Sequence, residues 1–65
     1  MVYTIETVKR DLPNINVRVG NKVTTGQVRG RLNKFATVHT NDNGSYEFAW
    51  QTVVNALNSD KPLLI

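Results

Sequence analysis

Cysteine is absent from this chain of 65 residues, and His39 is its only histidine. Disulfides and a structural zinc site, which often support domains of this size, are therefore excluded. With one histidine and five scattered carboxylates, neither a catalytic triad nor a metal site can be assembled within one chain. The sequence thus predicts a non-enzymatic protein with no metal and no cofactor.

Long apolar runs are also missing, and no stretch approaches the roughly 18 residues that a transmembrane helix requires. The first residues, MVYTIETVKRD, have neither the basic start and apolar run of a secretory leader nor an Arg/Ser-rich amphipathic leader. We therefore expect a cytoplasmic protein with no membrane partner. At 40% hydrophobic and 20% charged residues, without a linker or repeat, the chain has the composition of a single folded domain spanning residues 1–65.

Acidic residues are missing from the middle of the chain, between Leu12 and Asn41, and all five acids lie outside this range. The formal net charge is only +3, but its distribution is uneven. Five of the eight basic residues fall inside the acid-free range: Arg18, Lys22, Arg29, Arg31 and Lys34. The central part of the sequence is therefore a basic block.

Short helices are predicted near both ends. In TIETVKRDLP, Ile5, Val8 and Leu12 have helical spacing. Thr4 is a suitable N-cap, and Pro13 stops the helix. Because apolar and polar residues alternate at the start of this segment, a strand is also possible there. In WQTVVNALNSD, apolar residues recur at the spacing i, i+3, i+4 and i+7 of an amphipathic helix: Trp50, Val53, Val54 and Leu57. The final LLI is expected to pair as a last strand or to pack against a neighbour.

Four strands are predicted between the helices, in the segments INVRV, KVTTGQVRGRL, FATVHT and SYEFAW. Turn signals separate them at Gly20-Asn21, Asn33-Lys34 and Asn43-Gly44. If each signal closes a two-residue hairpin, Val17 opposes Thr24, Val28 opposes His39, and His39 opposes Phe48. One face of the sheet then carries the core: Ile15, Val17, Val19, Val28, Leu32, Phe35, Phe48 and Trp50, with His39 partly buried among them and Val54 and Leu57 packed against them.

Two glycines, Gly26 and Gly30, fall on the core face of the second strand, where they suggest a bend or a close backbone approach. A long bent strand suits a small barrel, because a flat sheet would leave exposed edges. We therefore expect a mainly β fold: a small bent antiparallel sheet or half-closed barrel, with a short N-terminal helix and a short amphipathic helix near the C-terminus. In outline this resembles the small barrels of Sm-like and Src-homology-type architecture.

The opposite face of the predicted sheet is basic. Arginines two residues apart on a strand project to one side, where their planar guanidinium groups can reach successive phosphates. The expected nucleic-acid-binding residues are Arg18, Lys22, Gln27, Arg29, Arg31 and Lys34. Because the aromatic residues of SYEFAW alternate toward the core, base stacking is not expected there, and the contact would be to the DNA or RNA backbone with little sequence preference.

Two other interpretations remain open. Alternating basic residues on an exposed strand also keep a sheet soluble and unpaired, without any partner. Val23, Val38 and the terminal LLI have no obvious place in so small a core, and could instead form a contact with a partner protein or a second copy. The alternative function is therefore that of a protein-interaction or oligomerising small subunit of a larger assembly.

Overall fold

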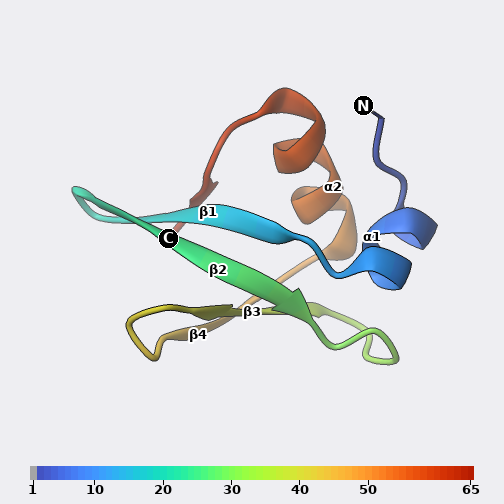
Figure 1. The fold of residues 1–65 in the computed structure, drawn as a ribbon, viewed down its shortest axis with the longest axis horizontal. Helices are drawn as coiled ribbons and strands as arrows, with labels where there is room; N and C mark the ends of the chain where they lie inside the picture. Colours follow the sequence, from blue (N-terminus) through green and yellow to red (C-terminus); the bar gives the residue numbers. More distant parts are fainter. Residues whose placement is uncertain (1) are drawn as a thin grey trace.

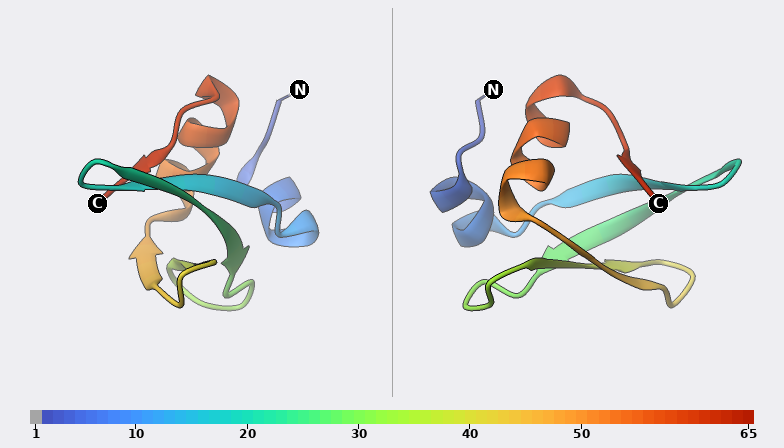
Figure 2. Two further views of the ribbon diagram at one scale, coloured as in Figure 1. Left: turned by 60° about the vertical axis from the view of Figure 1, so that its left-hand side comes forward. Right: turned by 180° about the vertical axis from the view of Figure 1, so that it is seen from behind.

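The computed structural model describes residues 2–65, which form one curled sheet with one helix before its first strand and another before its last (Figure 1). The elements, in chain order, are α1 (Ile5–Asp11), β1 (Asn14–Val19), β2 (Lys22–Arg29), β3 (Ala36–Thr40), β4 (Ser45–Phe48), α2 (Trp50–Ser59) and β5 (Leu63–Leu64). The strand order in the sheet is β4-β3-β2-β1-β5. The sheet bends into a half-barrel, and the two views of Figure 2 show α2 packed on its inner side.

This architecture confirms the predicted mainly β half-closed barrel with two short helices. It differs in one pairing: β5 runs parallel to β1, with Val17 opposite Leu63, so the sheet is mixed. The reason is the path of the chain, because α2 carries it back across the inner side of the sheet before β5 begins. No helix in residues 2–65 has the length and apolarity needed to cross a membrane.

The N-terminal helix begins where its sequence predicts. The Thr4 hydroxyl accepts a hydrogen bond from the Thr7 amide at 3.2 Å, and the Thr7 hydroxyl accepts one from the Thr4 amide at 2.9 Å. This reciprocal capping satisfies two amides that the first turn leaves without helical partners. The helix ends at Leu12, which adopts a left-handed conformation with φ of 46°. Val8 is fully buried and attaches the helix to the core.

The first hairpin has the predicted register. Val17 lies opposite Thr24 and Val19 opposite Lys22, around a two-residue turn in which Gly20 has a φ of 60°. Ile15 and Val17 are buried, so β1 turns the expected side toward the core.

The register between β2 and β3 was predicted wrongly. Val28 lies opposite Val38 and not His39. Strand β2 ends at Arg29, Gly30 takes a left-handed φ of 86°, and residues 30–35 form a loop where two residues were expected. Because successive side chains alternate between faces, a slip of one residue turns the whole of β3 over.

Reversal of β3 exchanges the side chains assigned to the core for those assigned to the surface. Ala36, Val38 and Thr40 are buried, whereas Phe35 is 45% exposed. The residues wrongly assigned to the core face are Leu32, Phe35 and His39, all of them exposed. The buried Val38 therefore leaves the set of residues proposed for a partner contact.

The turn between β3 and β4 is one residue longer than predicted. The Asn43 amide donates to the Thr40 carbonyl at 3.2 Å, the Thr40 amide donates to the Gly44 carbonyl at 2.8 Å, and Asn43 is left-handed with φ of 66°. His39 consequently lies opposite Ser45, and Ala36 opposite Phe48. The register between β3 and β4 differs from the predicted one by an odd number of residues, and an odd shift exchanges the two faces of a strand. This second exchange cancels the first for β4, so Phe48 packs against the core as predicted.

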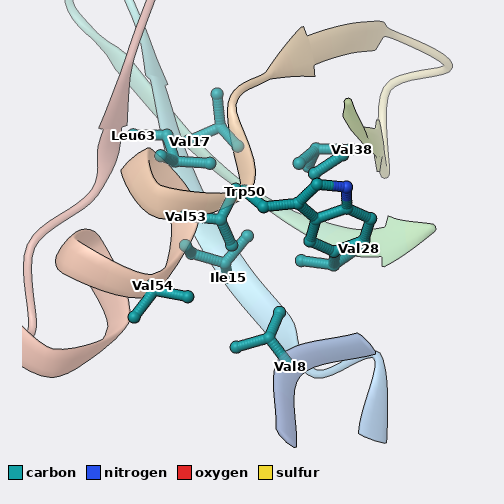
Figure 3. Close-up of a cluster of buried hydrophobic side chains, with 10 residues drawn as sticks. Val8, Ile15, Val17, Val28, Val38, Trp50, Val53, Val54 and Leu63 are labelled. Atoms are coloured by element: carbon teal, nitrogen blue, oxygen red, sulfur yellow. The ribbon is translucent and has the colours of Figure 1, made fainter. Parts of the chain in front are cut away.

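The core fills the space between the inner side of the sheet and α2 (Figure 3). Trp50 lies at the first position of α2 and is 6% exposed. The fully or nearly fully buried apolar residues are Val8, Ile15, Val17, Val28, Ala36, Val38, Trp50, Val53, Val54 and Leu63. Of the other predicted core residues, Val19, Phe48 and Leu57 are half-buried against this cluster. For Leu57 this agrees with the amphipathic helix pattern.

The ordering of the C-terminal strand can be tested with two adjacent leucines. Leu63 is 2% exposed, whereas Leu64 is 69% exposed. Leu63→Ala should lower the free energy of unfolding by about 2–5 kcal/mol, because it leaves a cavity in the core. Leu64→Ala, the matched control, should change it by less than about 0.5 kcal/mol. Denaturant unfolding measures both, and equal values for the two variants would contradict the docking of β5.

Candidate nucleic-acid interface

The structure places the predicted binding residues in three regions. Arg18, Gln27 and Arg29 point outward from the sheet, on the side opposite the core. Lys22 lies at the tip of the first hairpin, while Arg31 and Lys34 lie in the loop formed by residues 30–35. All six side chains are exposed, but they do not form one surface.

Arg18 and Arg29 lie far apart on the outward side of the sheet. Arg18 is opposite Val23, and Arg29 lies six positions farther along β2. At about 3.4 Å per residue, this separates the two backbone positions by roughly 20 Å. Arg31 does not share their face, contrary to the expectation, because β2 has already ended at Arg29.

The outward side of the sheet is not uniformly basic. Thr37 lies opposite Arg29, and Glu47 lies opposite Thr37. In the neighbouring row of paired residues on this face, His39 lies between Gln27 and Ser45. An acid thus occupies the same face as Arg29, two strands away, and most of the remaining positions are neutral.

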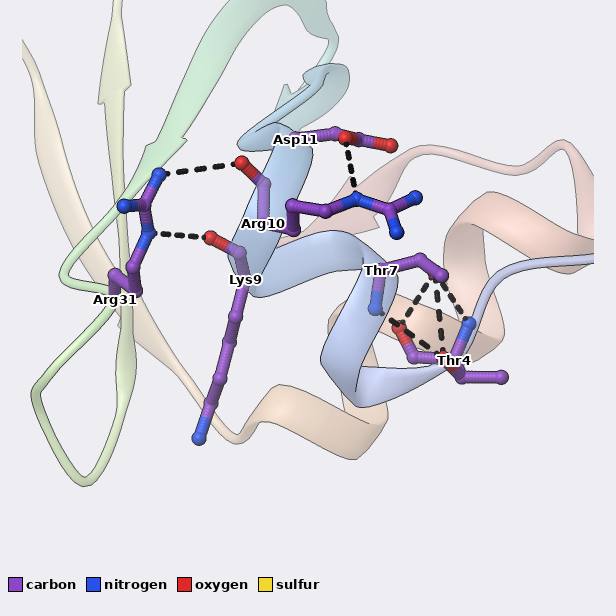
Figure 4. Close-up of polar contacts among 6 residues, drawn as sticks. All are labelled: Thr4, Thr7, Lys9, Arg10, Asp11 and Arg31. Atoms are coloured by element: carbon purple, nitrogen blue, oxygen red, sulfur yellow. Dashed lines mark hydrogen bonds and ion pairs between the residues drawn. The ribbon is translucent and has the colours of Figure 1, made fainter.

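Arg31 has a structural contact that the sequence did not reveal (Figure 4). Its Nε donates to the Lys9 carbonyl at 2.7 Å, and its Nη2 donates to the Arg10 carbonyl at 3.2 Å. These carbonyls belong to the last turn of α1, which lacks helical donors and has a partial negative charge that favours a cation. Arg31 therefore fastens the loop to the end of α1 while its Nη1 stays available to other acceptors.

Trp50 fastens the same loop from the core. Its Nε1 donates to the Asn33 carbonyl at 3.1 Å, which gives the buried indole its hydrogen-bond partner. The ammonium of Lys9 lies 5.1 Å from the centroid of the Trp50 ring, within the range of a cation–π contact. The loop is thus held at two points, and Lys9 is brought next to it.

The loop and the element ends beside it carry four cations and an exposed aromatic residue, which we call the loop-end patch: Lys9, Arg29, Arg31, Lys34 and Phe35. The ammonium of Lys34 lies 5.8 Å from the centroid of the Phe35 ring. Asp11, the nearest acid along the chain from Lys9, is paired with Arg10 at 3.1 Å, and this hydrogen bond and its charge raise the pKa of Arg10. The patch itself contains four cations and no acid.

Two members of the patch were missed by the sequence reasoning. Lys9 lies outside the acid-free range, and only its approach to Trp50 brings it to the loop. Phe35 was assigned to the core because Asn33-Lys34 was taken as a two-residue turn. Gly30 carried a signal for a longer loop, since a glycine directly after Arg29 can end a strand in a left-handed conformation.

The opposite end of the sheet is electrostatically balanced. Lys22 lies 3.8 Å from the carboxylate of Asp42, so the tips of two hairpins meet there. The Asp42 carboxylate also accepts a hydrogen bond from the buried Thr40 hydroxyl, which in turn accepts one from the Gly44 amide at 2.9 Å. The Thr40 hydrogen bond, helped by the charge of Lys22, lowers the pKa of Asp42.

Comparisons of the chain with models of known protein families, with curated protein sequences and with solved structures found no match. Within residues 2–65, no three histidine, cysteine, aspartate or glutamate side chains lie close enough together to hold a metal ion.

The contact between the hairpin tips predicts a pH dependence. The pKa of Asp42 is lower in the folded state than in the unfolded state, where it is near 3.9. The ionised carboxylate therefore stabilises the folded state at pH values above about 3.9. This stabilisation is lost as the pH falls through the folded-state pKa. Asp42→Asn should therefore lower the melting temperature at pH 7, and the difference from the parent should shrink below about pH 4. Glu47→Gln, which removes one negative charge from the same sheet, is the control at pH 7. A difference between Asp42→Asn and the parent that stayed constant with pH would contradict this assignment.

Proposed function

We propose that this protein is a small non-enzymatic module that contacts the phosphate backbone of nucleic acid through the loop-end patch. The observation that supports the proposal is that one braced loop and the element ends beside it carry four cations from separate segments. Lys9 comes from α1, Arg29 from the end of β2, and Arg31 and Lys34 from the loop. Asp11, the acid closest to them in the sequence, is engaged by Arg10.

The arginines of the patch are partly oriented before any ligand binds. Two carbonyls of α1 hold the Arg31 guanidinium, and the Gln27 side chain accepts a hydrogen bond from Nη2 of Arg29 at 3.3 Å. Fixing a side chain in advance reduces the conformational entropy that binding would otherwise cost. Guanidinium groups with free donors suit phosphate oxygens, and the ammonium groups of Lys9 and Lys34 add charge without a directional requirement.

Low sequence preference follows from the same geometry. Reading a base sequence requires side chains that enter a groove and match donors and acceptors on base edges. The cations of the patch lie on a short loop, a strand end and a helix end, and none of these is an extended element that would fill a groove. Contacts to phosphates position a protein on nucleic acid but carry no sequence information.

The test is the salt dependence of binding to a mixed-sequence duplex, measured by fluorescence anisotropy. Each phosphate neutralised on duplex DNA contributes about 0.9 to the slope of log K against log salt concentration. Arg29→Gln/Lys34→Gln should lower this slope by about 2 if each side chain contacts one phosphate. The fold should be retained, because both side chains are exposed and neither fastens the loop.

The matched control is Arg18→Gln/Lys22→Gln, which removes the same charge at the opposite end of the sheet. Its slope should stay close to that of the parent. An equal loss in both double variants would place the contact on the whole outward face, as the sequence first suggested. No salt-dependent binding by the parent would reject the proposal and leave the basic residues as a solvated surface.

A second candidate function, assembly with another copy of the chain, is favoured by a separate observation. Val23, Arg18 and Leu64 form one row on the outward side of the sheet, and Ile65 follows Leu64 in the chain. Val23, Leu64 and Ile65 are 56%, 69% and 53% exposed, and β5 is an edge strand. Exposed apolar side chains beside an open edge are typical of contacts between chains.

Light scattering tests this second candidate. The measured mass of the parent should rise above 7.3 kDa as its concentration increases. The mass of Leu64→Ser should rise less at the same concentrations. A constant monomeric mass over the concentrations used for the binding measurements would contradict assembly.

A further inference from the structure

We infer that the loop-end patch selects single-stranded over duplex nucleic acid, because Phe35 provides an exposed aromatic ring on which a base can stack. This inference rests on the proposed function and specifies its ligand. Base stacking on Phe35 is an uncharged, apolar interaction, whereas the phosphate contacts depend on charge. The two contributions to binding can therefore be measured separately.

Phe35 is placed to act together with the cations. It lies at the end of the loop, directly before β3, and is 45% exposed. The Lys34 ammonium lies 5.8 Å from the ring centroid. Because this ammonium lies over the ring, a base that stacked there would displace it, and the freed cation could then meet the phosphate of the same nucleotide. Such alternation of an aromatic surface with cations is the usual arrangement in proteins that bind single strands.

The loop keeps its apolar side chains in solvent although the core lies beneath it. Leu32 is 95% exposed, and Phe35 is nearly half exposed. The bonds from Trp50 to the Asn33 carbonyl and from Arg31 to the end of α1 use the inner side of the loop. Phe35 directly precedes the buried Ala36 of β3, and because successive side chains of a strand alternate between faces, its ring is directed away from the core. A ring held in solvent in this way is available to a ligand.

The distinction between the two forms of nucleic acid follows from base accessibility. In a duplex the flat faces of the bases are covered by their neighbours in the stack, so a protein surface meets mainly phosphates, sugars and base edges. A single strand can splay its bases outward, and each base then has a face free for an aromatic ring. Stacking is tolerant of sequence, since every base has such a face. It is therefore compatible with the low sequence preference of the proposed function.

The experiment compares a mixed-sequence single strand with the duplex of the same sequence, at one salt concentration, for the parent and two variants. The parent should bind the single strand at least about fivefold more tightly than the duplex. Phe35→Leu keeps an apolar side chain but has no aromatic face, and should weaken single-strand binding by at least about fivefold with no change for the duplex. Phe35→Tyr keeps the ring and should behave as the parent.

Salt dependence separates this inference from the proposed function. Loss of stacking releases no counterions, so Phe35→Leu should retain the parental salt slope. Equal binding of Phe35→Leu and the parent to the single strand would overturn the inference, while a reduced slope in Arg29→Gln/Lys34→Gln would still support backbone contact. An equal loss on single strand and duplex would also overturn it, since Phe35 would then act on the loop as a whole. Melting curves confirm that each variant is folded.

Discussion

The hydrogen bond from the Trp50 indole to the Asn33 carbonyl joins the core to the surface of this protein. The ring is 6% exposed, and its N–H must find a partner within the folded chain. The partner is a backbone carbonyl of the loop after β2, so the packing of the core fixes where that loop lies. Because Lys9 rests over the same ring, α1 is included in the arrangement. Together with the bonds from Arg31 to α1, this hydrogen bond sets the position of the loop that carries Lys34 and Phe35.

Alternation of side chains predicted the strands and their approximate bounds, but it could not determine the length of every turn. Gly20-Asn21 is the only turn signal between β1 and β2, and the register predicted from it is correct. After Arg29, both Gly30 and the following Asn33-Lys34 favour turns, and the alternation is equally regular for either choice. Choosing Asn33-Lys34 as the turn assigned the two faces of β3 the wrong way round. The turn before Gly44 is also longer than predicted, and this second error cancelled the first, so the faces of β4 were assigned correctly only by chance.

The candidate site was predictable in part. Exposure of the cations followed from their charge, and all six predicted residues are exposed. Their grouping did not follow from the sequence, because it depends on contacts between distant segments. Arg31 is linked to Lys9 across 22 residues, and no local pattern encodes that bond. The length of β2 separates Arg18 and Lys22 from the patch, although the sequence places them in the same basic block as Arg29, Arg31 and Lys34.

The parallel pairing of β5 with β1 has a consequence for the order in which the protein folds. Strands β1 to β4 are joined by short hairpins, whose closure costs little chain entropy. Leu63 reaches Val17 only after α2 has crossed the sheet, so this pairing closes the longest loop in the sheet. The hairpins should therefore form early, and the docking of β5 should come late in folding. Native-state hydrogen exchange should find β5 separating from β1 first, with Leu63 leaving the core while the hairpins stay closed.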